Sequence, residues 1–184
     1  MRKRILVLPL SAAILFLLVL YKHNQPRQTP TELAALAREF PAPLFQLFDQ
    51  SSQLVRLERY LGRHRLAIIF FDASKGADGD PLLQQLREEH EKFTAEDIQI
   101  LAISPLTPYA NRQAIERSGP FPFPLLSDPD FRVHREWGAF NRELREPRPA
   151  LFLINRAGCI AWSAVDEQTG IDAAALLERF NAIR

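Results

Sequence analysis

Two apolar runs constrain the fold of this chain more than any other feature. Residues 66–71 are apolar throughout, and residues 98–103 contain one polar side chain, Gln99. A strand with one wet face alternates apolar and polar residues, so continuous runs are typical of strands that are covered on both faces. We therefore predict that Phe70 and Ile100 lie on neighbouring strands at the centre of a sheet.

The segments around these runs alternate between helical and extended patterns. Between the two strands, Leu82, Leu86 and Phe93 recur near helical spacing and predict a helix at residues 81–93. The other predicted elements are extended segments within residues 44–57, helices at residues 108–117, 129–137 and 171–183, and strands at residues 151–155 and 160–163. The short turn between the last two strands makes them a hairpin. This order predicts an α/β sandwich with a central mixed β-sheet.

The N-terminal region carries an apolar segment at residues 5–21, directly after Arg2, Lys3 and Arg4. At about 1.5 Å per residue, a helix of this length reaches roughly 25 Å, near the lower limit for crossing a bilayer. A cleaved signal peptide would have an apolar region of about 7–15 residues followed by small residues. Residues 21–25 offer no small residue, so we predict an uncleaved transmembrane signal anchor.

This interpretation divides the chain into three parts. They are an anchor at residues 1–22, a polar linker with a short helix at residues 23–40, and one domain at residues 41–184. Positive charges lie mainly before the apolar segment, and such charges tend to stay in the cytoplasm. We therefore expect a single-pass protein that contacts the membrane through residues 5–21. Its domain would be extracytoplasmic, or periplasmic in a bacterium.

Composition excludes several classes of function. Lys and Arg total 23 against 22 Asp and Glu, with no basic stripe, so nucleic acid is not an expected partner. Cys159 is the only cysteine, which excludes an intramolecular disulfide and a zinc site built mainly from thiolates. Residues 72–80 are rich in oxygen ligands, but Ala77 and Leu83 stand where an EF-hand has Gly and Glu. We expect a solvated loop there, and neither a metal nor a cofactor.

Five segments, in this order, resemble the peroxiredoxin family, also called the alkyl hydroperoxide reductase and thiol-specific antioxidant family. They lie at residues 41–47, 69–71, 100–104, 123–130 and 152–158. The most specific is the octet Phe-Pro-Leu-Leu-Ser-Asp-Pro-Asp that begins at Phe123 and is followed by Trp137 and Gly138. The resemblance covers almost the whole chain after residue 40. It implies a thioredoxin-like three-layer sandwich and, for the family, thiol peroxidase chemistry.

The family's chemistry depends on a thiolate in the first turn of the helix after the first apolar run. Free N–H groups and the positive helix end lower the pKa of that thiol. The family motif there is Pro-x-x-x-Thr-x-x-Cys, and this chain has Asp72, Gly76 and Gly79 at its three defined positions. An arginine stands three residues before the position of Phe152, where this chain has Pro149. By this resemblance the active site is degenerate at all four positions and lacks the peroxidatic cysteine.

Four residues near these positions have predicted local roles. Asp80 and Pro81 resemble the N-cap and the first residue of a helix, with the Asp80 carboxylate accepting the N–H groups that a thiolate would otherwise meet. Thioredoxin-type oxidoreductases keep a cis-proline at the position of Pro149, so the resemblance raises the expectation of a cis bond there. We expect Arg148 to face solvent.

Two functions from different classes remain open. The first is a non-catalytic thioredoxin-fold binding or accessory module, whose protein partner would occupy an open groove at residues 72–80 and Pro149. The second is an antioxidant thiol oxidoreductase that acts through Cys159 with a partner's thiol. That function requires the sulfur of Cys159 to lie in an exposed, electropositive pocket. Free cysteine is more often a small buried apolar residue, so the binding module is favoured.

Overall fold

The computed structural model describes residues 40–166 and 171–183, all of which belong to one unit, Glu39–Arg184. The predicted anchor at residues 5–21 lies outside the described residues. Of the predicted linker only Phe40 is described, and it begins a strand rather than ending a helix. Within the described part of the chain, no helix is long and apolar enough to cross a membrane.

The two apolar runs form the central strands β4 (Arg65–Phe70) and β5 (Ile98–Ser104). They are parallel neighbours, with Ala67 opposite Ile100 and Phe70 opposite Ile103. The prediction that Phe70 and Ile100 occupy neighbouring central strands is therefore confirmed.

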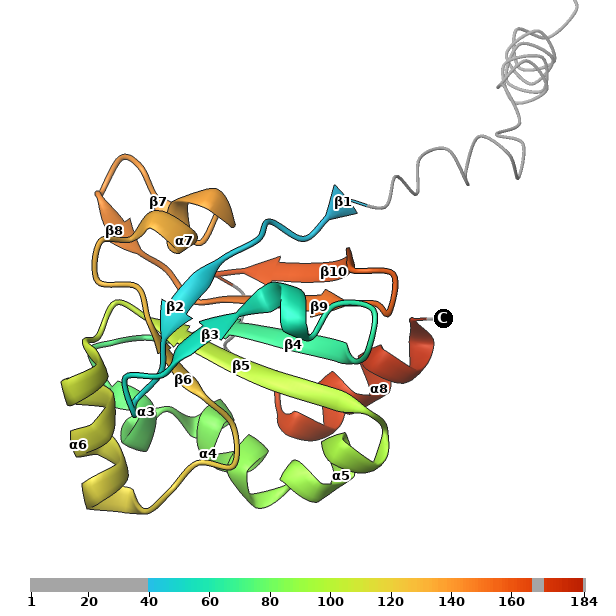
Figure 1. Cartoon of the computed structure of the whole chain (residues 1–184), viewed down its shortest axis with the longest axis horizontal. Coiled ribbons are helices and arrows are strands. Elements are labelled where there is room, and N and C mark those ends of the chain that lie inside the picture. The colour runs from blue at the N-terminus through green and yellow to red at the C-terminus, as the bar shows by residue number, and fades with distance from the viewer. Residues whose placement is uncertain (1–39, 167–170, 184) are drawn as a thin grey trace, which may run out of the picture. The chain divides into compact units, whose positions relative to one another are not determined.

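Six further strands complete a mixed sheet around this pair. They are β1 (Phe40–Pro41), β2 (Gln46–Phe48), β3 (Leu54–Arg56), β6 (Leu125–Ser127), β9 (Ala150–Ile154) and β10 (Cys159–Val165). The order is β1-β10-β9-β4-β5-β6-β2-β3, and only the β4–β5 and β5–β6 pairs are parallel (Figure 1). A separate two-stranded ribbon is made by β7 (Phe140–Asn141) and β8 (Glu146–Pro147). The predicted hairpin is confirmed as β9 and β10.

The helices follow the sequence pattern with two corrections. They are α3 (Gly76–Gly79), α4 (Pro81–Glu88), α5 (His90–Ala95), α6 (Pro108–Ser118), α7 (Arg132–Glu136) and α8 (Ala173–Ala182), with one turn of 3-10 helix, η1 (Leu57–Arg59). The single helix predicted at residues 81–93 is wrong, because the chain leaves helical geometry at Glu89 (φ −99°, ψ 9°). Residues 87–92 are all polar or charged, so no buried side chain supports a continuous helix there. The helix predicted at residues 129–137 is shorter, since Phe131 is left-handed (φ 57°).

Three of these helices begin at a side-chain cap. Asp80, Thr107 and Asp172 each accept a hydrogen bond from the backbone N–H three residues further on, at 3.0, 3.3 and 2.7 Å. Pro81 and Pro108 then occupy the start of α4 and α6, where a missing N–H has no cost. The prediction that Asp80 and Pro81 open a helix is confirmed.

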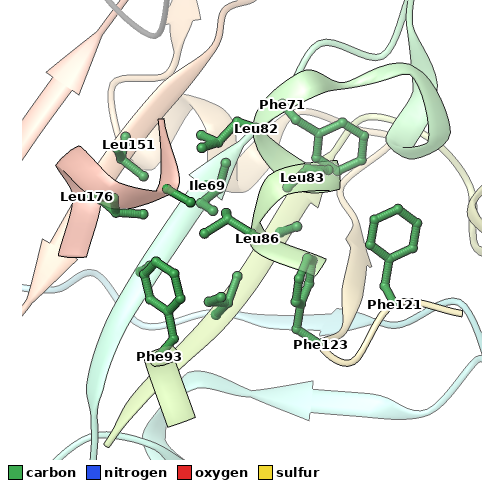
Figure 2. Packing of buried hydrophobic residues seen from close by; sticks show 14 of the residues in the cluster. Ile69, Phe71, Leu82, Leu83, Leu86, Phe93, Phe121, Phe123, Leu151 and Leu176 are labelled. Atoms are coloured by element: carbon green, nitrogen blue, oxygen red, sulfur yellow. The ribbon is translucent and has the colours of Figure 1, made fainter. Parts of the chain in front are cut away.

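The central strands bury side chains on both faces of the sheet. Ala67, Ile69 and Phe71 point into a core beneath α4, α5, α6 and α8, whereas Ile68 and Phe70 point into a second core with α7 and η1. This alternation is the ordinary geometry of a strand. In Figure 2, Ile69 lies near Leu86 and Phe71 lies beside Leu83, in one cluster that also contains Phe93 of α5 and Leu176 of α8. Two buried faces explain why the strands are apolar without interruption. The chain therefore has an α/β thioredoxin-like fold with a mixed sheet.

Candidate ligand-binding pocket

A pocket of about 700 Å³ opens at the edge of the sheet where β4 and β10 end and β9 begins. The strand register brings these ends together, because Ala150 pairs with Phe70 on one side and with Val165 on the other. The residues that line the pocket are Asp72, Lys75, Asp80, Pro81, Leu82, Gln85, Pro149, Asp166, Ile171 and Asp172. The pocket includes residues from the stretch 72–80 and Pro149, where we expected a groove from the sequence. Of the four degenerate positions, Asp72 and Pro149 line it.

Asp80 occupies the helix start that the family resemblance assigns to a thiolate. It is only 8% exposed, and its Oδ1 accepts the Leu83 N–H at 3.0 Å. Burial raises the pKa of the Asp80 carboxyl, and the Asp72 charge adds to this, although hydrogen bonds from the N–H groups of Leu83 and Leu82 and the Lys75 charge oppose the rise. The free N–H groups at the start of α4 are therefore already used by a carboxylate.

Helix α3 occupies residues 76–79 of the stretch 72–80, where a solvated loop was expected, and residues 73–75 form a turn. Arg117 on α6 holds it through a two-point ion pair with Asp78, with Nε and Nη2 at 2.7 and 2.9 Å from the two carboxylate oxygens. The Arg117 hydrogen bond lowers the pKa of the Asp78 carboxyl. The pair therefore links α3 to α6 beside the pocket.

The two glycines of α3 differ in what they permit. Gly76 has φ +67°, and a Cβ there would lie 2.7 Å from Asp78 Oδ1. Gly79 is exposed, and a Cβ there would meet only the Lys75 Cβ, at 3.4 Å. A side chain is therefore tolerated at Gly79 and strained at Gly76. Neither glycine is among the residues that line the pocket.

The start of β9 departs from two expectations. All peptide bonds of the described residues are trans, so Pro149 has no cis bond. Arg148 is not simply solvent-facing, because its side chain is 35% exposed and donates from Nη1 to Asp166 Oδ2 at 2.7 Å. Its Nη2 also donates to the Gly138 carbonyl at 3.3 Å. The Arg148 guanidinium is therefore paired beside the pocket, and Arg148 does not line the pocket itself.

Cys159 lies at the opposite end of the hairpin. It begins β10, whereas the pocket lies beyond Val165, so the strand separates the two by roughly 20 Å at about 3.3 Å per residue. The residue is half-buried, and its N–H donates to Asn155 Oδ1 at 2.9 Å. The structure therefore does not bring the chain's one thiol to the degenerate active-site positions.

Carboxylates dominate the chemistry of the pocket. Four aspartates line it against one lysine, Lys75. Each carboxylate has a local partner: Asp72 accepts the Ser74 N–H and hydroxyl at 2.8 Å, Asp166 pairs with Arg148, and Asp80 and Asp172 cap helices. No group of three His, Cys, Asp or Glu side chains in the described residues could hold a metal ion. The pocket is thus an acidic site without a nucleophilic sulfur.

Sequence reasoning missed the part of the pocket that comes from the end of the chain. Asp166 and Asp172 follow β10 and precede α8, more than eighty residues after Asp80. The Gln85 side chain joins the two regions by accepting the Ala173 N–H at 3.1 Å. The position of Asp172 before an amphipathic helix predicts an N-cap. This local pattern does not predict that the cap lies beside residues 72–85.

A second missed feature is a buried hydrogen-bonded pair of a histidine and an aspartate, which supports the β4 end from the other face of the sheet. His134 Nδ1 lies 2.6 Å from Asp128 Oδ2, and both side chains are at most 1% exposed. The Phe70 ring packs edge-on against the His134 ring, with centroids 4.9 Å apart. Burial acts to raise the pKa of Asp128, but hydrogen bonds from His134 and from the Val133 N–H outweigh it and lower that pKa. The pair is inside the core, so its role is structural.

Comparison with known proteins defines the class of this chain. Its fold matches solved peroxiredoxin structures: peroxidoxin BcpB from Mycobacterium tuberculosis (TM-score 0.65, 21% identity, 79% of this chain and 97% of that one) and Mycobacterium bovis AhpC (TM-score 0.67, 17% identity, 78% and 90%). Residues 39–163 match the model of the AhpC/TSA family. Alkyl hydroperoxide reductase E from Mycobacterium tuberculosis is 34% identical over 128 residues, which cover 68% of this chain and 83% of that protein. The chain belongs to the AhpC/TSA family.

Proposed function

We propose that this AhpC/TSA domain is a non-catalytic binding or accessory module. The observation that carries the proposal is the Asp80 carboxylate, which is buried at the start of α4 and accepts the N–H groups there. In the family resemblance, those N–H groups would lower the pKa of a thiol. A carboxylate in this place stabilises the helix, but it does not attack the O–O bond of a peroxide productively.

The surroundings of Asp80 support the same conclusion. Peroxide reduction requires a thiolate in line with the O–O bond and donors that stabilise the departing oxygen. The residues that line the pocket include no sulfur, and Gly76 offers no hydroxyl. The two arginines beside this region are both paired, Arg148 with Asp166 and Arg117 with Asp78. Negative charge at Asp72 and Asp80 would also oppose the formation of a thiolate nearby.

Peroxide consumption by the purified full-length chain tests this proposal. With a thiol reductant present, we expect the wild type and Cys159→Ser to consume hydrogen peroxide at the rate of the reductant alone. We expect Gly79→Cys to stay close to the rate of a simple thiol, because it restores a nucleophile without its donors. Turnover by the wild type would refute the non-catalytic role. A rate for Gly79→Cys that is orders of magnitude above a free thiol would show that the start of α4 still activates sulfur.

The alternative is an antioxidant thiol oxidoreductase that acts through Cys159 with a partner's thiol. Membership of a family with alkyl hydroperoxide reductases favours it, as does the partial exposure of Cys159. In that case the wild type, but not Cys159→Ser, would form a mixed disulfide with a partner and consume peroxide. Loss of activity in Cys159→Ser with an unchanged melting curve would identify a working thiol.

We propose that a protein partner occupies the pocket. The lining residues Lys75, Asp166 and Asp172 are exposed, so the surface of a partner protein can reach the pocket. A photo-crosslinking amino acid at Lys75, an exposed lining residue, should capture that partner. The same group at Arg63, which is exposed and does not line the pocket, is the matched control. Equal capture from both positions would contradict this choice of site.

We also propose that residues 5–21 anchor the domain to a membrane and leave it outside the cytoplasm. The apolar length of this segment and the charges of Arg2, Lys3 and Arg4 support the proposal. N-terminal sequencing of the protein purified from membranes should find the apolar segment intact. A mature protein that begins after residue 13 or residue 21 would refute the anchor.

A further inference from the structure

A second hollow, of about 450 Å³, lies beside the ribbon that joins α7 to β9. It is lined by Arg135, Gly138, Phe140, Asn141, Arg142, Glu143 and Arg148. Helix α7 and the β7–β8 ribbon lie next to each other in Figure 1. None of the residues that line this hollow also lines the acidic pocket. The charge is reversed here, because three arginines and one glutamate give the lining a net charge of +2.

Arg135 is held in place by aromatic rings rather than by a carboxylate. Its guanidinium carbon lies 4.9 Å from the centre of the Phe140 ring and 5.8 Å from that of the Phe131 ring. Its Nη1 donates to the Asp130 carbonyl at 2.8 Å. These contacts fix the plane of the guanidinium and leave further N–H groups as donors. Among the described residues, Arg135 has no ion-pair partner, so its charge is not neutralised there.

The turn between β7 and β8 adds a neutral donor and a second cation. Asn141 Oδ1 accepts the N–H groups of Glu143 and Leu144 at 3.0 and 3.1 Å, so the Asn141 side chain is held by its oxygen. Its amide nitrogen remains available as a donor. Arg142, next in the chain, is exposed and forms no ion pair with a described residue.

Arg148 supplies the third cation at the rear of the hollow. Its two terminal nitrogens donate to Asp166 and to the Gly138 carbonyl, which fixes the guanidinium beside Gly138. Each of these nitrogens carries a second N–H group. Since Asp166 neutralises much of the Arg148 charge, Arg135 and Arg142 are the main sources of positive potential.

We propose that this hollow binds a small oxyanion, a phosphate or a carboxylate, through Arg135, Arg142 and the Asn141 amide. Guanidinium groups present paired N–H donors that match the oxygens of such groups, and hydrogen bonds between charged partners are the stronger kind. The size of the hollow leaves room for an organic group that carries the oxyanion. The proposal does not rest on the function of the acidic pocket, and either can fail without the other.

Titration of the full-length protein with inorganic phosphate, and separately with acetate, tests this proposal by isothermal calorimetry at low ionic strength. We expect saturable binding of at least one of them. Arg142→Gln should weaken binding about tenfold, the effect of losing one charged hydrogen-bonding partner. Arg145→Gln is the matched control, because Arg145 is exposed in the same turn, does not line the hollow and carries the same charge.

The comparison of the two variants decides the outcome. Tighter binding of phosphate would identify a phosphate-bearing ligand, and tighter binding of acetate would identify a carboxylate, and each result supports an oxyanion site. Absence of saturable binding by both anions would overturn the proposal. Equal weakening in Arg142→Gln and Arg145→Gln would also overturn it, since it would show general screening of charge rather than a site. Circular dichroism of both variants confirms that the fold is retained.

Discussion

The buried carboxylate of Asp80 gives the sharpest test of how this site is built. Asp80→Ala removes the cap of α4 and leaves the N–H of Leu83 without its acceptor, at a position where Leu83 is fully buried. Loss of an N-cap costs about 1 kcal/mol, and an unpaired buried N–H raises the cost toward about 3 kcal/mol. For a chain of this size, each kcal/mol lowers the melting temperature by about 2–4 °C. Asp80→Ala should therefore be clearly destabilised.

Asp80→Asn keeps an oxygen that can cap the helix and removes the negative charge. The asparagine oxygen can still accept the Leu83 N–H, while the charge that burial disfavours is gone. Because the pKa of Asp80 is raised in the folded state, the folded protein binds a proton more tightly than the unfolded chain does. Ionised Asp80 therefore lowers the free energy of unfolding above its folded pKa, and this cost disappears as the pH falls toward about 4, the unfolded pKa. At pH 7 we expect Asp80→Asn to be at least as stable as the wild type.

Urea unfolding of wild type, Asp80→Ala and Asp80→Asn at pH 7 and at several values down to pH 4 measures both effects. The stability of Asp80→Asn relative to the wild type should be highest at pH 7 and should decline as the pH falls. The deficit of Asp80→Ala should persist at every pH, because it comes from the missing acceptor. If Asp80→Asn is as unstable at pH 7 as Asp80→Ala, the charge itself holds the helix start, and our reasoning about burial is wrong.

Three further predictions concern residues that do not line the pocket. Gly76→Thr should cost about 1–3 kcal/mol in thermal unfolding, because a β-branched residue there adopts a left-handed φ and its Cβ meets Asp78; an unchanged melting temperature would contradict the strain. Cys159→Ser, at a half-buried position, should change stability by less than about 1 kcal/mol and leave binding at the pocket intact. Asp128→Asn should cost about 3 kcal/mol, because it breaks the buried pair with His134. Because the pKa of Asp128 is lowered in the folded state, its contribution to the free energy of unfolding should be full above about pH 4 and should fall as the pH drops below that value. Urea unfolding midpoints measured across that pH range would check this.

Features governed by local pattern could be predicted from the sequence. The strands β4 and β5 were predictable because a strand buried on both faces carries no polar alternation. The start of α4 was predictable because Asp80 followed by Pro81 satisfies the free N–H groups of a helix and tolerates the missing donor. Both signals lie within a few residues of the structure they predict.

Features that depend on contacts between distant segments could not be predicted in this way. The sequence pattern did not show that Arg148 would pair with Asp166, because that contact depends on the register of β9 and β10. The order of α3 was missed for a related reason, since Arg117 on another helix fixes it through Asp78. The trans bond at Pro149 also departs from what the family resemblance implied. The pocket region therefore differs from the sequence-based prediction mainly in its two ion pairs, Arg148 with Asp166 and Arg117 with Asp78.

Asp80 accepts the N–H groups at the start of α4, and these are the groups that a thiolate at this site would need. The N–H groups of Leu82 and Leu83 can serve either a capping carboxylate or a nearby thiolate, and here the carboxylate has them. A site that stabilises a reactive thiolate gives up some of the stability that a cap supplies, as active sites commonly do. If the proposed non-catalytic role is correct, a cysteine at Gly79 would not by itself supply that chemistry, because Asp80 would still compete for the same donors. It would also require a hydroxyl at Gly76, where the left-handed backbone and the Asp78 carboxylate oppose any side chain. The cap of α4 occupies the N–H donors that a thiolate needs, and the backbone of α3 opposes a hydroxyl-bearing side chain, so both features support the proposed binding module.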